Sequence, residues 1–226
     1  MSKFLPQIGQ PYVLVEGGGI FPVRRIYCVG RNYADHAREM GSDPNREPPF
    51  FFSKPADAVI QGHHVPYPPM TSDLHHEAEL VLALASGGRD LTPEAADAAI
   101  WGYAVGVDLT RRDLQAEAKE KGRPWDLAKG FDHSAPIGRI SPRDGVEIGN
   151  ATAIRLSVDG IVRQQGTLGQ MSWAPAEIVS RLSAYVELKP GDLIFTGTPS
   201  GVGPLRRDQH VVAEIEGLSK VMFTIE

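Results

Sequence analysis

The feature that most constrains this fold is a pair of acidic residues leading directly into an apolar run. Residues 74–85 read Leu-His-His-Glu-Ala-Glu-Leu-Val-Leu-Ala-Leu-Ala, and the apolar part is typical of a buried β-strand. Because strand side chains alternate between two faces, Glu77 and Glu79 share a face with His75. Their α-carbons are then about 6.6 Å apart, so both carboxylates can reach one cation. The same alternation is also typical of a solvated strand face.

A third carboxylate favours the cation site. Residues 102–107 form a second predicted strand, which ends at Asp108. An Asp at this place often caps a helix, but Thr110 is the better cap, with Asp113 at the capping-box position. Asp108 is therefore left without a structural role. Three carboxylates from two strands, with no cysteine partner, predict a site for a hard cation, Mg²⁺ or Mn²⁺ rather than Zn²⁺.

Composition predicts a strand-rich globular fold. The chain has 226 residues, 42% of them hydrophobic and 23% charged, which is ordinary for a soluble protein. Its 24 glycines and 18 prolines interrupt many short apolar runs, a pattern that favours strands over helices. No repeat or linker divides the chain. We therefore expect one domain over residues 1–226, a β-rich α+β fold built as a mixed sandwich or rolled barrel with three or four helices.

Charge and hydropathy exclude several classes of function. The net charge of −5 argues against nucleic acid as a partner. Residues 1–10 contain no apolar signal core, and no segment approaches the 18 apolar residues that would cross a membrane. The single cysteine, Cys28, cannot form a disulfide within the chain, which fits a reducing compartment. We expect a cytoplasmic protein.

Local patterns predict several elements. Asp159-Gly160 between two alternating runs indicates a type I′ hairpin, and Lys189-Pro190-Gly191-Asp192 indicates a type II turn. Residues 172–184 form an amphipathic helix with Ile178, Leu182 and Tyr185 on one side. The remaining predicted elements are a hairpin over residues 12–23, a strand over 26–29, buried strands over 50–54 and 193–196, helices over 92–100 and 111–121, and a closing hairpin over 211–225.

His36 and Glu39 are three residues apart in a predicted short helix that ends at Gly41. The polar, proline-bearing segment 42–49 follows directly, so this region is a candidate lid over a site. An ordinary surface helix with a local polar pair is the alternative interpretation.

Two further segments have open interpretations. Lys129 is the single lysine of the mostly apolar segment 125–131; it either extends to water or faces the acidic residues, where it would stabilise an anionic substrate. The glycine-rich segment 197–203 lacks the Lys-Ser/Thr of a phosphate-binding loop. Its N–H groups could hold a carboxylate, or it is a wide turn.

Taken in order, these motifs resemble the fumarylacetoacetate hydrolase family over nearly the whole chain. The motifs are residues 29–36, 75–80, 106–113, 125–131 and 190–203. Within the family the chain is similar to the short fumarylpyruvate and acylpyruvate hydrolases. Three further segments resemble the bacterial fumarylpyruvate hydrolases of gentisate breakdown, namely residues 38–41, 46–52 and 54–58.

The resemblance implies a mixed β-sandwich roll, a homodimer and a Mg²⁺ or Mn²⁺ cofactor. It also implies roles for nine residues: Glu77, Glu79 and Asp108 as metal ligands, Lys129 as the cation of the site, His36 and Glu39 as the lid pair that activates water, and Gln115, Thr198 and Arg112 as substrate contacts.

The implied reaction is hydrolysis of a C–C bond in a 2,4-dioxo acid, with fumarylpyruvate giving fumarate and pyruvate. The distal carboxylate of fumarylpyruvate needs a cation, for which Arg31, Arg38 and Arg112 are candidates. The alternatives are an acylpyruvate hydrolase, an oxaloacetate decarboxylase with the same metal site, and a non-catalytic metal- or acid-binding domain. The His36/Glu39 pair argues against the last, because binding alone requires no base.

Overall fold

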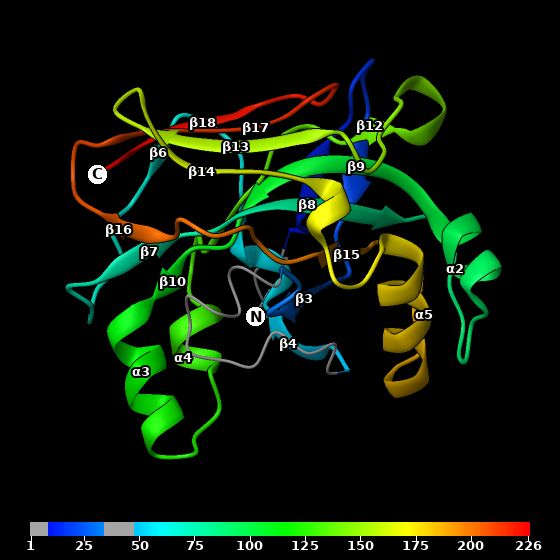
Figure 1. Ribbon diagram of the computed structural model, residues 1–226, viewed down its shortest axis with the longest axis horizontal. Helices are drawn as coiled ribbons and strands as arrows, with labels where there is room; N and C mark the ends of the chain where they lie inside the picture. The colour runs from blue at the N-terminus through cyan, green and yellow to red at the C-terminus, as the bar shows by residue number, and fades with distance from the viewer. Residues whose placement is uncertain (1–8, 34–47) are drawn as a thin grey trace, which may run out of the picture.

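The computed structural model describes residues 9–33 and 48–226. Its centre is a mixed sheet of six strands (Figure 1). Neighbouring strands are antiparallel except β15 and β3, which run parallel. In spatial order the strands are β12 (Ser141–Pro142), β9 (Ile100–Val107), β8 (Ala78–Leu84), β15 (Asp192–Phe195), β3 (Arg25–Gly30) and β4 (Phe50–Lys54).

A second sheet of five strands lies above the central sheet in Figure 1. The β13–β14 connection confirms the predicted type I′ hairpin, because Asp159 (φ 52°) and Gly160 (φ 75°) both adopt positive φ. The strands in spatial order are β14 (Ile161–Thr167), β13 (Ala153–Val158), β17 (His210–Ile215), β18 (Val221–Ile225) and β6 (His64–Val65).

Smaller elements surround these two sheets. The short strands are β10 (Thr110–Arg111), β7 (Leu74–His76) and β16 (Gly203–Leu205) in one sheet, β1 (Tyr12–Leu14) with β2 (Ile20–Pro22), and β11 (Ala135–Pro136) with β5 (Val59–Ile60). The helices are α2 (Pro93–Ala99), α3 (Arg112–Glu120), α4 (Asp126–Lys129) and α5 (Pro175–Tyr185), with 3₁₀ turns at Ala56–Ala58, Arg143–Gly145 and Leu168–Gln170. None of the helices in the described ranges is long and apolar enough to cross a membrane.

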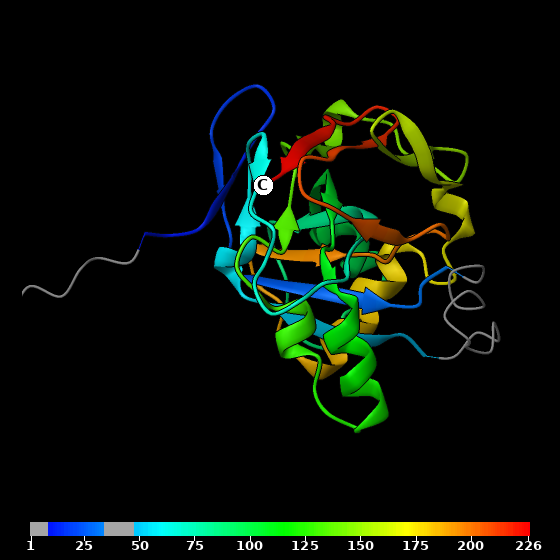
Figure 2. The same ribbon diagram turned by 90° about the vertical axis from the view of Figure 1, so that its left-hand side faces the viewer.

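The apolar run of β8 is buried on both faces, which explains why it has no polar alternation. Leu80 and Leu82 belong to the main core, together with side chains of the five-stranded sheet such as Leu156. Val81 belongs to a second cluster that the β1–β2 hairpin closes through Val13. Figure 2 shows this hairpin at the left edge of the molecule. The predicted strand-rich α+β fold, a mixed sandwich roll, is confirmed.

Three local predictions were wrong. Thr110 does not cap α3; it pairs with His75 in β10, and the helix begins at Arg112 without a side-chain cap. Tyr185 is 72% exposed and does not share the buried face of α5 with Leu182. Residues 50–54 form an edge strand, β4, rather than a buried one, with Lys54 as its one buried residue.

The type II turn before β15 provides a stability test. Gly191 has φ +92°, and a Cβ there would lie 2.8 Å from the carbonyl oxygen of Pro22. Gly122 also has positive φ (+61°) but no atom within 4 Å of its Cβ position. Gly191→Ala should therefore lower the free energy of unfolding by about 1–3 kcal/mol more than Gly122→Ala, because it adds a clash to the conformational cost. Equal losses in urea denaturation would contradict the clash.

Candidate metal centre and active site

Three carboxylates meet at the point where β8 begins and β9 ends. Glu77 lies between β7 and β8, Glu79 lies in β8, and Asp108 follows β9. The antiparallel register pairs Glu79 with Gly106, and the Asp108 N–H donates to the Glu77 carbonyl at 2.8 Å. The potential ligand atoms all lie within 4.8 Å of one another, and the residues are 5%, 2% and 0% exposed. The structure thus brings the three predicted ligands into one buried cluster, and excludes a solvated strand face.

Two predicted cations contact this cluster. Lys129, the last residue of α4, places its Nζ 2.7 Å from Glu77 Oε2 and 2.8 Å from Asp108 Oδ2. Burial alone would lower the pKa of the Lys129 ammonium, but Asp108 and Glu77 outweigh burial and raise it. Lys129 therefore stays charged and faces the acids instead of extending to water. Arg112 donates to Glu77 Oε1 at 2.6 Å.

Sequence reasoning missed a third cation, Lys54. It ends β4, is 2% exposed, and places its Nζ 2.8 Å from Asp108 Oδ1. Its hydrogen bonds go to the carbonyls of Leu109 and Lys129. The signal was present in the sequence, since a charged residue ends an apolar strand there, as Asp108 does after β9.

The cluster fits a divalent metal ion. Asp108 Oδ1 is fully buried, and apart from its ion pair with Lys54 it accepts no hydrogen bond from the residues that the structure describes, so it is free to ligate a cation. Burial raises the pKa of Glu79 well above its usual range, and the charges of Asp108 and Glu77 raise it further. A bound cation would remove this penalty, and three carboxylates are the donor set that Mg²⁺ or Mn²⁺ prefers.

The glycine-rich segment after β15 holds one of these carboxylates. The Gly197 N–H donates to Glu79 Oε2 at 2.7 Å. Gly197 has φ +93°, and a Cβ would lie 2.8 Å from the Cβ of Asn32, so glycine is required there. The carboxylate that this segment holds therefore belongs to the chain itself.

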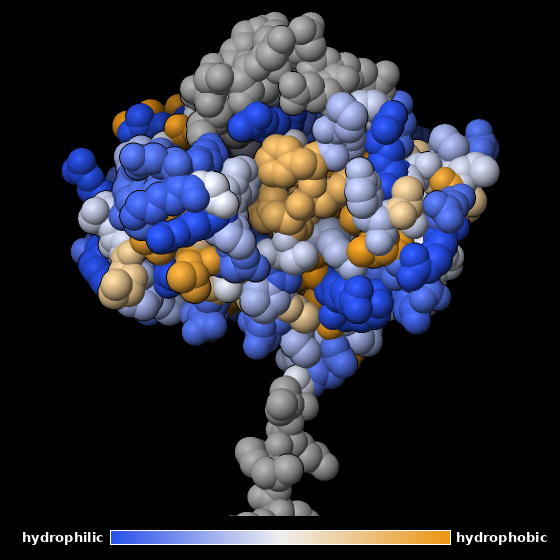
Figure 3. Space-filling view, turned by 90° about the horizontal axis from the view of Figure 1, so that it is seen from below, coloured by the Kyte–Doolittle hydropathy of each residue, from blue (hydrophilic) through white to orange (hydrophobic). Residues whose placement is uncertain are grey.

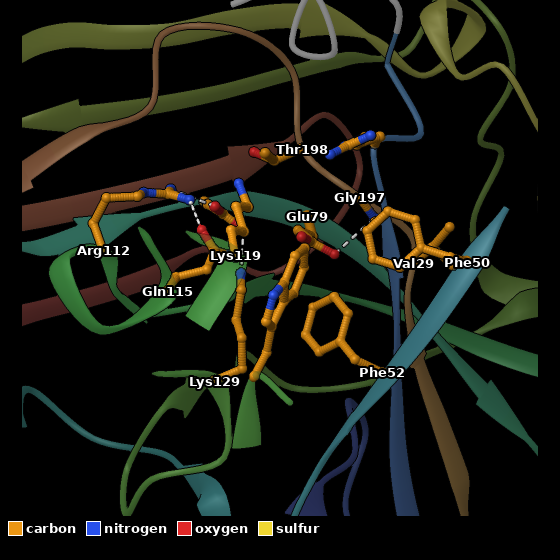
Figure 4. A pocket seen from close by; sticks show the side chains of 14 residues that line it. Val29, Phe50, Phe52, Glu79, Arg112, Gln115, Lys119, Lys129, Gly197 and Thr198 are labelled. Atoms are coloured by element: carbon orange, nitrogen blue, oxygen red, sulfur yellow. Dashed lines mark hydrogen bonds and ion pairs between the residues drawn. The ribbon is translucent and has the colours of Figure 1, made fainter. Parts of the chain in front are cut away.

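A pocket opens over the cluster, and Figure 4 shows the side chains around it. Aromatic rings form one wall, where Trp125 packs against Phe50 and Phe52 at centroid distances of 5.3 and 5.9 Å. The remaining lining includes two cations besides those already described, Arg31 and Lys119. Sequence reasoning did not find Lys119, because its place in α3 resembles that of any exposed helix residue.

The predicted substrate contacts also line this pocket. Arg112 donates to Gln115 Oε1 at 2.7 Å, which leaves the Gln115 Nε2 group to donate elsewhere. Thr198 Oγ1 accepts a hydrogen bond from Gln164 Nε2 at 2.8 Å. Gln164 is a further buried polar residue that sequence reasoning missed.

The predicted lid pair, His36 and Glu39, lies outside the described residues, as does Arg38. Their assignment stays a prediction from the sequence.

Comparison with known proteins identifies the family. The family model described as fumarylacetoacetate (FAA) hydrolase C-terminal matches residues 25–226. The solved fumarylpyruvate hydrolase of Pseudomonas aeruginosa, in complex with Mn²⁺ and pyruvate, is 49% identical, with a TM-score of 0.95 over 100% of this chain and 99% of that one.

Two curated relatives have different named activities. Fumarylpyruvate hydrolase of Ralstonia sp is 41% identical over 184 residues, which are 81% of this chain and 95% of that protein. The mitochondrial oxaloacetate tautomerase FAHD1 of Arabidopsis thaliana is 41% identical over 202 residues, 89% of this chain and 91% of that protein. Together with the family model, this similarity means that the chain belongs to the fumarylacetoacetate hydrolase family.

Proposed function

We propose that this chain is a metal-dependent hydrolase that cleaves fumarylpyruvate to fumarate and pyruvate. The observation that carries the proposal is the buried cluster of Glu77, Glu79 and Asp108 beneath a pocket rich in hydrogen-bond donors. We propose Mg²⁺ as the metal, with Mn²⁺ as a substitute. When bound, the metal supplies a Lewis acid that polarises the 2-oxo acid end of the substrate.

The described residues have separate roles in this scheme. Gln115 Nε2 and the Thr198 hydroxyl donate to the 2-oxo acid end. Lys129, held in its charged form, stabilises the negative charge that develops on the pyruvate carbon as the C3–C4 bond breaks. Lys54 and Arg112 orient Asp108 and Glu77 through ion pairs.

Hydrolysis also requires an activated water. We assign this role to His36, with Glu39 holding its imidazole in the required tautomer; the assignment rests on their spacing and on the family resemblance. A histidine suits the task because its ordinary pKa lies near neutral pH.

The pocket also carries cations for a second carboxylate. Arg112 already bonds Glu77 and Gln115, whereas Arg31 and Lys119 lack a carboxylate partner within the described ranges and lie over aromatic rings instead. Burial and the charges of Arg112 and Arg31 lower the pKa of Lys119, which indicates excess positive potential there. This potential supports a substrate with a distal carboxylate, as fumarylpyruvate has.

Oxaloacetate is the second candidate substrate, because a relative 41% identical to this chain is named for oxaloacetate chemistry. Its decarboxylation would use the same metal site and needs no activated water. A Mg²⁺-dependent screen of fumarylpyruvate, acetylpyruvate and oxaloacetate, compared by kcat/KM, tests the choice. A substantially higher kcat/KM for oxaloacetate would overturn the hydrolase proposal in favour of a decarboxylase. A higher kcat/KM for acetylpyruvate would favour an acylpyruvate hydrolase. No turnover of any of the three substrates would favour a binding domain.

We also propose a cytoplasmic homodimer. Figure 3 shows an apolar area at the centre of the lower face of the molecule. Tyr185 is 72% exposed, and Phe50 of the edge strand β4 is 37% exposed. Exposed apolar area of this kind is typical of contact surfaces. A monomeric mass in sedimentation equilibrium at micromolar concentration would exclude the dimer.

The metal site makes the first functional prediction. Glu77→Ala, Glu79→Ala and Asp108→Ala should each weaken Mg²⁺ binding by about 100-fold or more, because loss of a ligand exceeds the usual effect of an outer contact. Isothermal titration calorimetry measures this, with Glu117→Ala as the matched control, because Glu117 is an exposed carboxylate on α3. Unchanged affinity in one variant would remove that residue from the ligand set.

The cations of the pocket give the second functional prediction. Lys119→Met should raise KM for fumarylpyruvate about 5- to 10-fold, because a charged hydrogen bond to the distal carboxylate is lost. KM for acetylpyruvate, which lacks this carboxylate, should stay within about twofold. Lys121→Met is the control, since Lys121 pairs with Glu117 at the end of the same helix. Equal changes for both substrates would assign the distal carboxylate elsewhere.

The predicted lid pair, His36 and Glu39, gives the third functional prediction. His36→Ala should lower fumarylpyruvate hydrolysis about 10²- to 10⁴-fold, the usual effect of losing a general base. Mg²⁺ affinity should not change, and any oxaloacetate decarboxylation should fall much less because it needs no activated water. Loss of Mg²⁺ affinity would make His36 a metal ligand. An equal fall of both activities would instead assign the helix a role in positioning the substrate.

A further inference from the structure

Gln164 is a buried polar residue in a strand that otherwise faces solvent. In β14, Ile161 and Val162 are 57% and 36% exposed, whereas Gln164 is 0% exposed. The pairing of β14 with β13 explains how Gln164 turns inward. Leu156 pairs with Gln164 and Ser157 pairs with Val162, so Arg163 is an extra residue in β14 and forms a bulge. Such a bulge re-aims the side chain that follows it. A strand that buries an amide and exposes its apolar residues needs a reason beyond core packing.

The Gln164 amide uses all of its hydrogen-bonding capacity. Oε1 accepts from His76 Nδ1 at 2.9 Å and from the Ala78 N–H at 3.1 Å. Nε2 donates to Thr198 Oγ1 at 2.8 Å and to the Pro199 carbonyl at 2.9 Å. An amide has two N–H groups and two lone pairs, so each is occupied.

Two of these partners fix which end of the amide is which. The Ala78 N–H can only donate and the Pro199 carbonyl can only accept, so exchanging the oxygen and nitrogen of Gln164 would break both bonds. It follows that His76 Nδ1 carries a proton and that Thr198 Oγ1 accepts. This polarity holds for either charge state of His76.

The consequence for Thr198 is a free donor. With Oγ1 accepting from Gln164, the hydroxyl has one hydrogen to donate, and it donates to no other group in the part of the chain that the structure describes. Thr198 lines the same pocket as Glu79 and Lys129 (Figure 4). His76 and Ala78, the other partners of Gln164, directly flank the predicted metal ligand Glu77.

We propose that Gln164 is a positioning residue that turns the Thr198 hydroxyl into a dedicated donor to the carboxylate of a bound 2-oxo acid. The identity of this ligand rests on the proposed function. The alternative is that Gln164 only joins β14 to its neighbours, and would then affect stability but not ligand binding through Thr198.

The experiment measures pyruvate binding to the Mg²⁺-loaded protein by calorimetry. Pyruvate contains the 2-oxo acid end alone, so the result does not depend on which bond the protein cleaves. Thr198→Val should weaken binding about 10- to 100-fold, the scale for a hydrogen bond to a charged group, whereas Thr198→Ser should stay within about threefold. Mg²⁺ affinity should stay the same in both variants.

Thr196→Val is the matched control. Thr196 is equally buried and lies two residues earlier, but its hydroxyl donates to the Leu80 carbonyl. Its loss should lower stability and leave pyruvate affinity within about twofold.

Gln164→Glu then tests the link to Thr198. The ionised carboxylate that this substitution introduces donates to neither Thr198 Oγ1 nor the Pro199 carbonyl, and it accepts the Thr198 hydrogen itself. At a pH where this carboxyl is ionised, Gln164→Glu should weaken pyruvate binding as much as Thr198→Val, and the double variant should be no weaker than either single variant.

Several results would overturn the proposal. If the double variant lost pyruvate affinity by the product of the two single losses, Gln164 would act by a route other than Thr198. Unchanged pyruvate affinity in Thr198→Val would show that the hydroxyl is not the donor. This unchanged affinity would refute the proposal even where Gln164→Glu fails to fold. Wild-type protein that binds no pyruvate would also refute it. Pyruvate binding with the expected pattern, but no C–C hydrolysis in the substrate screen, would leave this inference standing and remove the proposed function.

Discussion

Three carboxylates buried within 4.8 Å of one another impose the main constraint on this structure. Each ion loses its hydration, so the fold must bring compensating charge from separate elements. Lys129 comes from α4, Lys54 from β4 and Arg112 from the start of α3. The formal charges of the three carboxylates and the three cations cancel before any metal ion binds. A divalent ion therefore leaves the site positive, which favours binding of metal and anionic substrate together over metal alone.

The part of this site that could be predicted from the sequence is the part encoded locally. Alternation along a strand places Glu77 and Glu79 on one face, and an acid at the end of an apolar strand marks Asp108. Pairing between distant strands is not encoded in this way. The pairing of β10 with β7 uses Thr110 in a strand, so its local preference for a cap is overridden.

The same reasoning explains which residues were missed. Lys54 and Gln164 are buried polar residues whose partners lie 34 to 88 positions away. The charged end of an apolar strand marks Lys54 in the sequence, but no local pattern indicates which distant residues it or Gln164 would contact. Gln164 also follows a bulge, which shifts the strand period at that point and turns the amide inward. The fold class was accessible because it depends on many short strands, each with its own turn chemistry, so that errors in single elements did not change it.

The segment after β15 shows how one short loop can serve metal and substrate at once. Gly197 donates to the carboxylate of Glu79, while the next residue, Thr198, presents its hydroxyl to the pocket. Two buried amides hold this loop, Asn32 through the Thr196 carbonyl and Gln164 through Thr198 and Pro199. Each amide also forms a hydrogen bond to a second chain segment, Asn32 to Trp173 and Gln164 to Ala78. Neither amide can therefore turn without breaking buried hydrogen bonds elsewhere. Donors fixed in this way need no reorganisation when charge develops on the substrate, which is the main requirement for electrostatic catalysis.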